Sequence, residues 1–242
     1  MTTLLILFVV CTLGSVIQGV TGFGFAIVAM SVLPFFMPFK TAVVIIAILA
    51  LIMTAQMSYR LRKYIRLKVL IIPLITSIIG TAAGVFALEI LPSYSLKPIV
   101  GGVLVAISIW LIWFKNVIRI SGNSLTGALI GFSSGLMGGL CSVSGPPLAA
   151  YYYTILDTKS EYSATTQATF SISGICTILL HLYYGNISNE VLINIFPGII
   201  GILSGSYFGA IIFEKLNHDT LGGLIGILTL LMGAVMLISG FM

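Results

Sequence analysis

The stretch GSVIQGVTGFGFAIVAM (14–30) lies inside a long apolar run and carries glycines at positions 14, 19, 22 and 24. A second stretch, GFSSGLMGGLCSVSGPPLAAYYY (131–153), interrupts a later apolar run with glycines and the pair Pro146–Pro147. Glycine accepts non-helical backbone and proline lacks an N–H donor, so both stretches predict an interrupted helix. The surrounding runs, 3–37 and 124–156, are also too long for one straight crossing, which needs about 20 residues.

Composition places the chain in a membrane. Hydrophobic residues make up 59% of the 242 residues and charged residues only 7%, against roughly 25% in an average soluble domain. The formal net charge of +5 is therefore interpreted as a signal of membrane orientation and not as a nucleic-acid patch. The three cysteines show no metal-ligand spacing, and no catalytic triad or phosphate-binding loop is present. We predict no enzyme activity, no cofactor and no metal site.

The apolar segments repeat. They lie at about 3–37, 41–59, 67–91, 96–114, 124–156, 162–184, 190–213 and 219–241, which gives four segments in 1–119 and four in 120–242. A shift of 125 residues lays GTAAGVFALEIL (80–91) on GSYFGAIIFEKL (205–216) and pairs Glu89 with Glu214. A shift of 116 lays Gly19 and Gly22 on Gly135 and Gly138. We therefore predict an all-α integral membrane protein of two four-segment repeats.

Basic residues choose between two topologies. If all eight segments cross the membrane, the eleven basic residues divide seven to four between its sides. If the two glycine-broken segments are re-entrant hairpins, the division is nine to two, which fits the cytoplasmic bias of Lys and Arg better. Each repeat would then cross three times, and the repeats would be inverted. The eight-crossing arrangement stays open as the alternative.

Polar groups near the breaks form the predicted binding site. A broken helix leaves free N–H groups at the start of its second half, and these attract anions. The expected substrate-binding residues are Gln18, Thr21, Gly22, Gly24, Ser142, Ser144, Gly145 and Gln167. Three further features have plain interpretations: His181 is expected to be an interfacial anchor, Tyr151–Tyr153 an aromatic belt or gate, and Cys141 an ordinary buried residue.

The chain resembles the sulfite exporter TauE/SafE family of bacterial and archaeal permeases. The resemblance rests on GVTGFGFAIVAMSVLPFF (19–36), GFSSGLMGGLCSVSGPPL (131–148) and the Gly-xxx-Gly third segment of each half. Phe23, Phe25 and Leu140 interrupt glycine runs that are fuller in many members, which leaves the substrate open. The resemblance implies a multi-pass cell-membrane transporter of small sulfur-containing anions such as sulfite or organosulfonates.

Several alternatives remain at this stage. A passive anion channel, or a permease for another small metabolite or ion, would fit the same segments. For a secondary transporter, the expected partners are a small anionic substrate, the lipid bilayer and a coupling ion such as the proton. Nucleic acid is not an expected partner, and a homo-oligomer is compatible with the sequence.

Overall fold

The computed structural model describes residues 2–92 and 122–215, together with isolated helical positions at 102, 105, 227, 230, 231, 234 and 238. Within these residues the chain is helical and contains no strand. The elements are α1 (Thr2–Thr21), α2 (Phe25–Val32), η1 (Leu33–Phe35), α3 (Phe39–Arg60), η2 (Arg62–Tyr64), α4 (Leu67–Ile90), α6 (Ser124–Cys141), α7 (Gly145–Ile155), α8 (Lys159–Tyr183) and α9 (Asn189–Lys215). The segments expected at 96–114 and 219–241 lie outside the described residues.

Helix ends in the two glycine-rich stretches have local causes. Between α1 and α2, Gly22 and Gly24 have φ angles of 84° and 115°, a region that side chains with a Cβ disfavour. Between α6 and α7, Ser142 takes a left-handed conformation with φ 59°. The next helix begins at Gly145 with two prolines at its first positions, where a missing N–H costs nothing.

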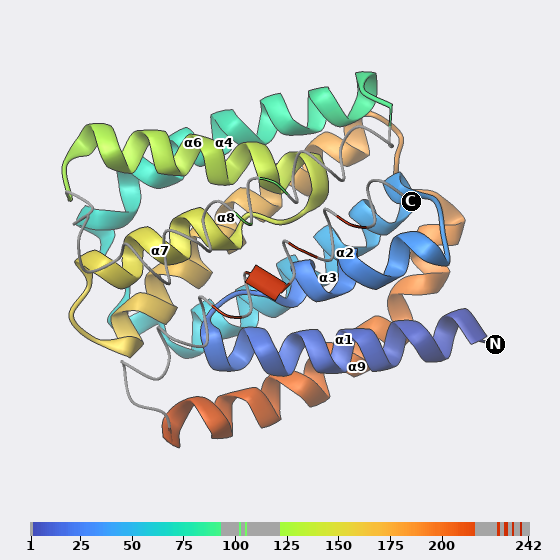
Figure 1. The fold of residues 1–242 in the computed structure, drawn as a ribbon, viewed down its shortest axis with the longest axis horizontal. Helices are drawn as coiled ribbons and strands as arrows, with labels where there is room; N and C mark the ends of the chain where they lie inside the picture. The colour runs from blue at the N-terminus through green and yellow to red at the C-terminus, as the bar shows by residue number, and fades with distance from the viewer. Residues whose placement is uncertain are drawn as a thin grey trace.

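Each pair of helices around these stretches forms a hairpin. The backbone of Phe25 lies against Gly14, so α2 returns along α1. The hydroxyl of Ser134 donates to the carbonyl of Ser144, so α7 returns along α6 in the same way. Figure 1 shows α1 and α6 starting from opposite ends of the bundle.

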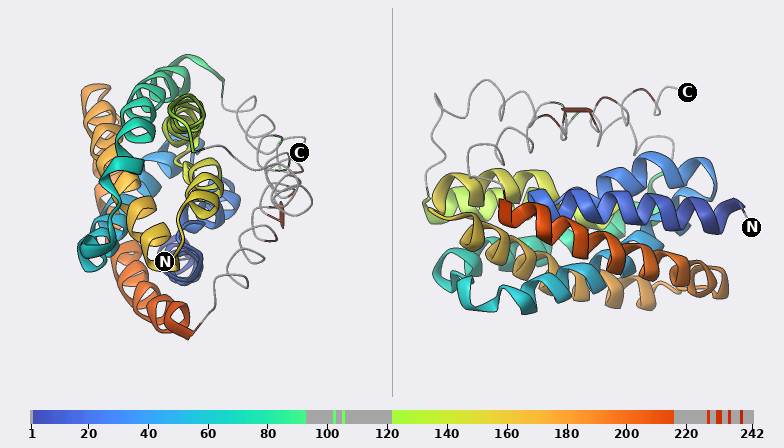
Figure 2. Two further views of the ribbon diagram at one scale, coloured as in Figure 1. Left: turned by 90° about the vertical axis from the view of Figure 1, so that its left-hand side faces the viewer. Right: turned by 90° about the horizontal axis from the view of Figure 1, so that it is seen from below.

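The hairpins pack sideways through glycines. Helix α1 lies along α9, and α6 lies along α4, as the end-on view in Figure 2 shows. A Cβ on Gly19 would lie 2.8 Å from the Cα of Gly209, and a Cβ on Gly84 would lie 2.9 Å from the Cα of Gly139. Close backbone approach of this kind is the usual role of small residues in membrane helices.

The two packings correspond to each other with a register that differs from the sequence expectation. Gly84 and Gly209 are 125 residues apart, as the sequence shift predicted. Their partners Gly139 and Gly19 are 120 residues apart, and so are the helix ends at Cys141 and Thr21. Glycines recur so often in these stretches that the 116-residue shift also aligned them. By its place in the packing, Gly19 therefore corresponds to Gly139 and not to Gly135.

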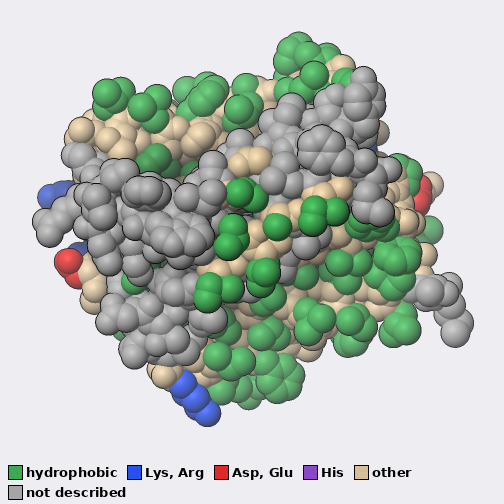
Figure 3. Space-filling view, in the orientation of Figure 1, with side chains coloured by type: hydrophobic (Ala, Val, Ile, Leu, Met, Phe, Trp, Pro, Cys, Tyr) green, Lys and Arg blue, Asp and Glu red, His purple; other side chains and the backbone are tan. Residues whose placement is uncertain are grey.

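The outer faces of the bundle are apolar. The exposed large side chains of α9 include Ile193, Phe196, Ile200, Leu203, Tyr207 and Ile211, which recur at helical spacing opposite the glycines. Figure 3 shows hydrophobic side chains along the described flanks and charged ones towards the two ends. By length and composition, α1, α3, α4, α6 and α9 could each cross a membrane. Helix α8 is as long but more polar, and its polar residues are turned inward.

Most of the described basic residues lie at one end of the bundle. Of the eleven basic residues, those at 97, 115 and 119 lie outside the described ranges, which leaves eight. Seven lie at the end where α3 finishes and α4 and α8 begin, here called the basic end: Arg60, Arg62, Lys63, Arg66, Lys68, Lys159 and Lys215. Lys40 alone among the eight lies at the opposite end, paired with Glu89.

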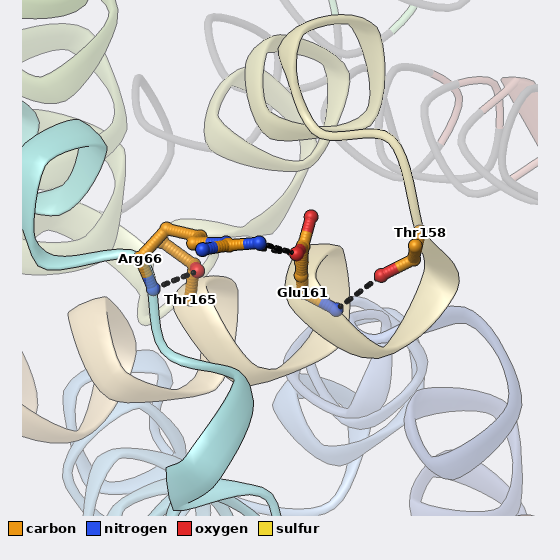
Figure 4. Close-up of polar contacts among 4 residues, drawn as sticks. All are labelled: Arg66, Thr158, Glu161 and Thr165. Atoms are coloured by element: carbon orange, nitrogen blue, oxygen red, sulfur yellow. Dashed lines mark hydrogen bonds and ion pairs between the residues drawn. The ribbon is translucent and has the colours of Figure 1, made fainter.

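One set of contacts fastens the basic end of α8 to the start of α4. The hydroxyl of Thr158 accepts the N–H of Glu161 at 3.2 Å and caps α8. The carboxylate of Glu161 binds the guanidinium of Arg66, and the N–H of Arg66 donates to the Thr165 hydroxyl at 3.1 Å, as Figure 4 shows. These bonds help to set the position of α8 along the axis of the bundle.

Candidate functional site

A small cavity lies where the two hairpin turns approach each other. Its volume is about 60 Å³, and its walls come from α3, α4, α8 and both turns. Since a cavity needs about 10–15 Å³ of such volume to hold one water, this one has room for roughly four water-sized groups. Its polar lining residues are Gln18, Thr54, Thr81, Ser142, Ser144, Ser173 and Thr177.

The eight predicted site residues fall into two groups. Gln18, Gly24, Ser142, Ser144 and Gly145 line the cavity, and they come from both halves of the chain. Thr21, Gly22 and Gln167 are not part of its lining and lie in the wall around the first turn. The structure therefore brings five of the residues together around one space and gives the other three supporting contacts.

The first turn is held by side chains from α8. The amide of Gln167 donates to the carbonyl of Gly22 at 2.8 Å and accepts from the Gln18 amide at 3.2 Å. Gln18 in turn accepts the N–H of Phe25 at 3.2 Å, the first donor of α2. The Tyr162 hydroxyl donates to the Thr21 carbonyl at 2.7 Å. These three buried backbone groups at the turn thus have partners, as an interrupted helix inside an apolar bundle requires.

The second turn is held differently. Its Ser142 hydroxyl donates to the carbonyl of Val43 at 2.9 Å, and its Ser144 carbonyl accepts from Ser134. Because Pro146 and Pro147 have no N–H, α7 begins with fewer free donors than an ordinary helix. The sequence expectation of free N–H groups at both breaks therefore applies better to α2, where the N–H groups of Ala26 and Ile27 have no acceptor within the helix. Both residues line the cavity.

The cavity lining is mostly apolar, and its polar groups are uncharged. No Asp, Glu, Lys, Arg or His occurs among the described residues that form it. Its donors are hydroxyls, the Gln18 amide and the first turn of α2, whose dipole favours negative charge. Ser142, Ser173 and Thr177 give their protons to backbone carbonyls and can redirect them by rotating about one bond. Within the described ranges, no three His, Cys, Asp or Glu side chains gather where they could hold a metal ion.

The sequence did not predict four of the polar lining residues. Thr54 on α3 and Thr81 on α4 are isolated hydroxyls in apolar helices, and nothing in the local pattern marks them as facing a cavity. Ser173 and Thr177 on α8 had a usable signal, because they continue a four-residue spacing of hydroxyls that begins at Thr165 and Thr169.

Three expectations for single residues can also be compared with the structure. Tyr151 and Tyr152 are buried in the bundle and do not form an aromatic belt, since both pack inward from α7. His181 is fully buried and is not an interfacial anchor. Cys141 is fully buried, and its thiol lies 3.1 Å from the Met137 carbonyl, away from the cavity lining.

A larger cavity of about 430 Å³ opens at the basic end. It is lined by α3, η2, α8 and α9, with Arg60, Lys159 and Glu214 at its edge. Lys159 donates to the carbonyls of Phe213 and Glu214, and Arg60 lies 3.7 Å from the Glu214 carboxylate. The larger cavity reaches Gly19, whose chain neighbour Gln18 lines the smaller one.

The chain is similar to one known protein family along most of its length. The family model described as sulfite exporter TauE/SafE matches residues 7–236, nearly the whole chain. The chain belongs to the TauE/SafE family. This TauE/SafE protein is accordingly a membrane transporter, which agrees with its apolar flanks and five helices able to span a bilayer. No curated protein and no solved structure matches the chain significantly.

Proposed function

We propose that this protein is a secondary transporter of a small sulfur-containing anion, such as sulfite or an organosulfonate. The observation that carries the proposal is the cavity between the two hairpin turns, to which both turns contribute polar groups without charge. A space for roughly four water-sized groups suits an oxyanion of about four heavy atoms, or the head of a larger sulfonate. The family description, sulfite exporter, points to the same chemistry.

Neutral donors suit a site that must release its ligand. A buried Lys or Arg would hold an anion strongly and would itself be costly in the membrane. Hydroxyls, an amide and the first turn of α2 can replace an anion's hydration shell without a fixed countercharge. The cavity therefore favours a transported anion over a tightly held one.

The arrangement of the hairpins suggests how access to the cavity alternates between the two sides of the membrane. Helices α1 and α9 run parallel from the opposite end, whereas α4 and α6 run parallel from the basic end. We interpret 1–119 and 120–242 as inverted repeats whose re-entrant hairpins enter the membrane from opposite sides and meet at the cavity. The basic end then faces the cytoplasmic side of the cell membrane, and the larger cavity is the route from that side to the smaller cavity. Rocking of one repeat against the other would close that route and open the other side.

Transport by a cavity-filling variant tests the proposal. Gly174 lines the cavity, and the atom nearest to a Cβ placed there belongs to Leu51, at 3.4 Å. Gly174→Val should therefore fold yet reduce anion flux in proteoliposomes by at least about tenfold, because each added methyl occupies about the space of a water. Gly122→Val, outside the cavity and 3.7 Å from its nearest neighbour, is the matched control. Gly22 is a poorer target, because its φ of 84° makes any side chain strained.

The substrate panel should contain sulfite, an organosulfonate, sulfate and a carboxylate. We expect saturable flux of a sulfur oxyanion that is driven by a proton or other ion gradient. Unchanged flux in Gly174→Val would reject the cavity as the transport site. Flux that does not saturate and does not couple to any gradient would favour a passive anion channel.

Topology is tested by single cysteines. The native thiols Cys11, Cys141 and Cys176 are first replaced. Cysteines at Thr2 and Met37 should react from outside the cell, and cysteines at Asn123 and Asp157 from the cytoplasm. Eight crossings would instead put the two members of each pair on different sides. Such a result would remove the inverted arrangement while leaving the cavity intact.

A further inference from the structure

A line of polar side chains runs along α8 beyond the cavity. Thr165, Thr169, Ser173, Thr177 and His181 recur every four residues, so each is the neighbour of the next along the helix. All five are buried. The hydroxyls of Thr169, Ser173 and Thr177 each donate to the carbonyl four residues earlier. Ser173 and Thr177 line the cavity, which places His181 one turn, about 6 Å, farther towards the opposite end.

The imidazole of His181 is only half satisfied. Its side chain is fully buried, and Nδ1 lies 3.1 Å from the side-chain nitrogen of Asn186. Its Nε2 has no hydrogen-bond partner among the residues that the structure describes. A buried donor or acceptor without a partner costs about 1–3 kcal/mol, so native proteins rarely keep one without a reason.

Neighbouring charges determine which nitrogen carries the proton. The Glu89 carboxylate pairs with Lys40 and can only accept hydrogen bonds. Asn186 must therefore turn its NH₂ group towards Glu89, at 2.7 Å. The same NH₂ group faces Nδ1 of His181, so Nδ1 accepts and the neutral ring carries its hydrogen on Nε2. The unpartnered atom is thus a buried N–H donor, which an acceptor would satisfy.

We propose that the Nε2–H of His181 is the donor of a second anion-binding position, on the route between the cavity and the opposite end. The inference rests on the proposed function, since its ligand is the transported anion after it leaves the hydroxyls of α8. Glu89 and Lys40 face this ring from α4 and α3, and Asn186 faces it from the segment after α8. The paired charges of Glu89 and Lys40 largely offset each other, so a neutral imidazole donor can pass an anion on without trapping it.

Two substitutions separate hydrogen-bond donation from other roles. His181→Met fills similar space without a donor, whereas His181→Gln keeps an N–H near the position of Nε2 but cannot carry a charge. Hydrogen bonds to charged groups contribute about 1.5–3 kcal/mol, so His181→Met should raise the half-saturating sulfite concentration in proteoliposomes by about tenfold or more. His181→Gln should stay within about threefold of the unmodified protein. Leu182→Met, on an exposed neighbour, should change nothing.

A measurement on the unmodified protein does not depend on variant folding. The chain has only two histidines, so protein labelled with ¹⁵N-histidine gives two ring spectra, and the spectrum of His181→Gln assigns them. We expect the Nε2–H tautomer for His181 and a shift of its signal when sulfite is added. The Nδ1–H tautomer, or no shift at saturating sulfite, would overturn the inference.

The outcomes also separate this inference from the proposed function. Sulfite transport with equal half-saturation in His181→Met overturns the second position alone. Equal loss in His181→Gln and His181→Met replaces donation with proton carriage or a structural role, and so also overturns it. If the unmodified protein transports no anion of the panel and its histidine spectrum does not respond, the proposed function fails and this position fails with it.

Discussion

The bridge between Gln18 and Gln167 should contribute measurably to stability. Replacing Gln167 with Leu removes the donor to the Gly22 carbonyl and the acceptor of the Gln18 amide. Both groups are buried. Each polar group left without a partner costs about 1–3 kcal/mol, so we expect the free energy of unfolding to fall by about 2–6 kcal/mol. The effect comes from the polar groups left behind, because Leu itself suits an apolar interior.

The adjacent residue provides a matched control. Thr166 is fully buried beside Gln167, but its hydroxyl has no hydrogen-bond partner among the described residues. Thr166→Val keeps the shape of the side chain and removes a polar group that is already unsatisfied. We therefore expect equal or slightly higher stability for Thr166→Val. Like Gln167→Leu, this substitution introduces an apolar residue at a polar, buried position of α8, which makes it a matched control.

Thermal unfolding of the purified variants in one detergent measures the difference. For a chain of this size, 1 kcal/mol corresponds to a Tm shift of about 2–4 °C. Gln167→Leu should therefore lower the Tm by at least about 4 °C, and Thr166→Val should not lower it. If both variants unfold at the same temperature, the bridge does not hold the first turn, and the contacts of Gln167 carry little of the free energy.

Two further predictions concern the packing and the basic end. Gly84→Val should lower the Tm by several degrees, because its Cβ would lie 2.9 Å from the Cα of Gly139 and force α4 and α6 apart, whereas Gly174→Ala, with 3.4 Å to its nearest neighbour, should not. A smaller Tm loss in Gly84→Val than in Gly174→Ala would contradict this packing. Glu161→Gln should lower the free energy of unfolding by less than about 1 kcal/mol, since its partner Arg66 is largely exposed. Salt screens such a pair, so the loss should be smaller in high salt. A large loss that does not depend on salt, measured in the same unfolding assay, would contradict a screened ion pair.

The breaks were predictable because their causes are local. Gly22 and Gly24 take positive φ just after α1 ends at Thr21. In the second stretch α6 ends at Cys141 before the left-handed Ser142, and the paired prolines lie in the first turn of α7. The roles of individual residues at the breaks were less accessible. Gln167 is predicted to touch the substrate, and the structure shows that its amide binds Gly22 and Gln18. Which polar group a side chain meets depends on the neighbouring helix.

The amino-acid sequence by itself determined that this chain belongs in a membrane, that two glycine-rich stretches interrupt it, and that its third segments share a 125-residue spacing. Composition and backbone preference act residue by residue, so they can be read without knowing the fold. Only the tertiary structure decided that Gly19 packs against Gly209 and Gly139 against Gly84, and that Thr54 and Thr81 face the same cavity. It also decided that His181 is buried and that its Nε2 has no hydrogen-bond partner among the described residues. Those features depend on how helices distant in sequence are rotated and shifted against each other, and close packing between backbones fixes both.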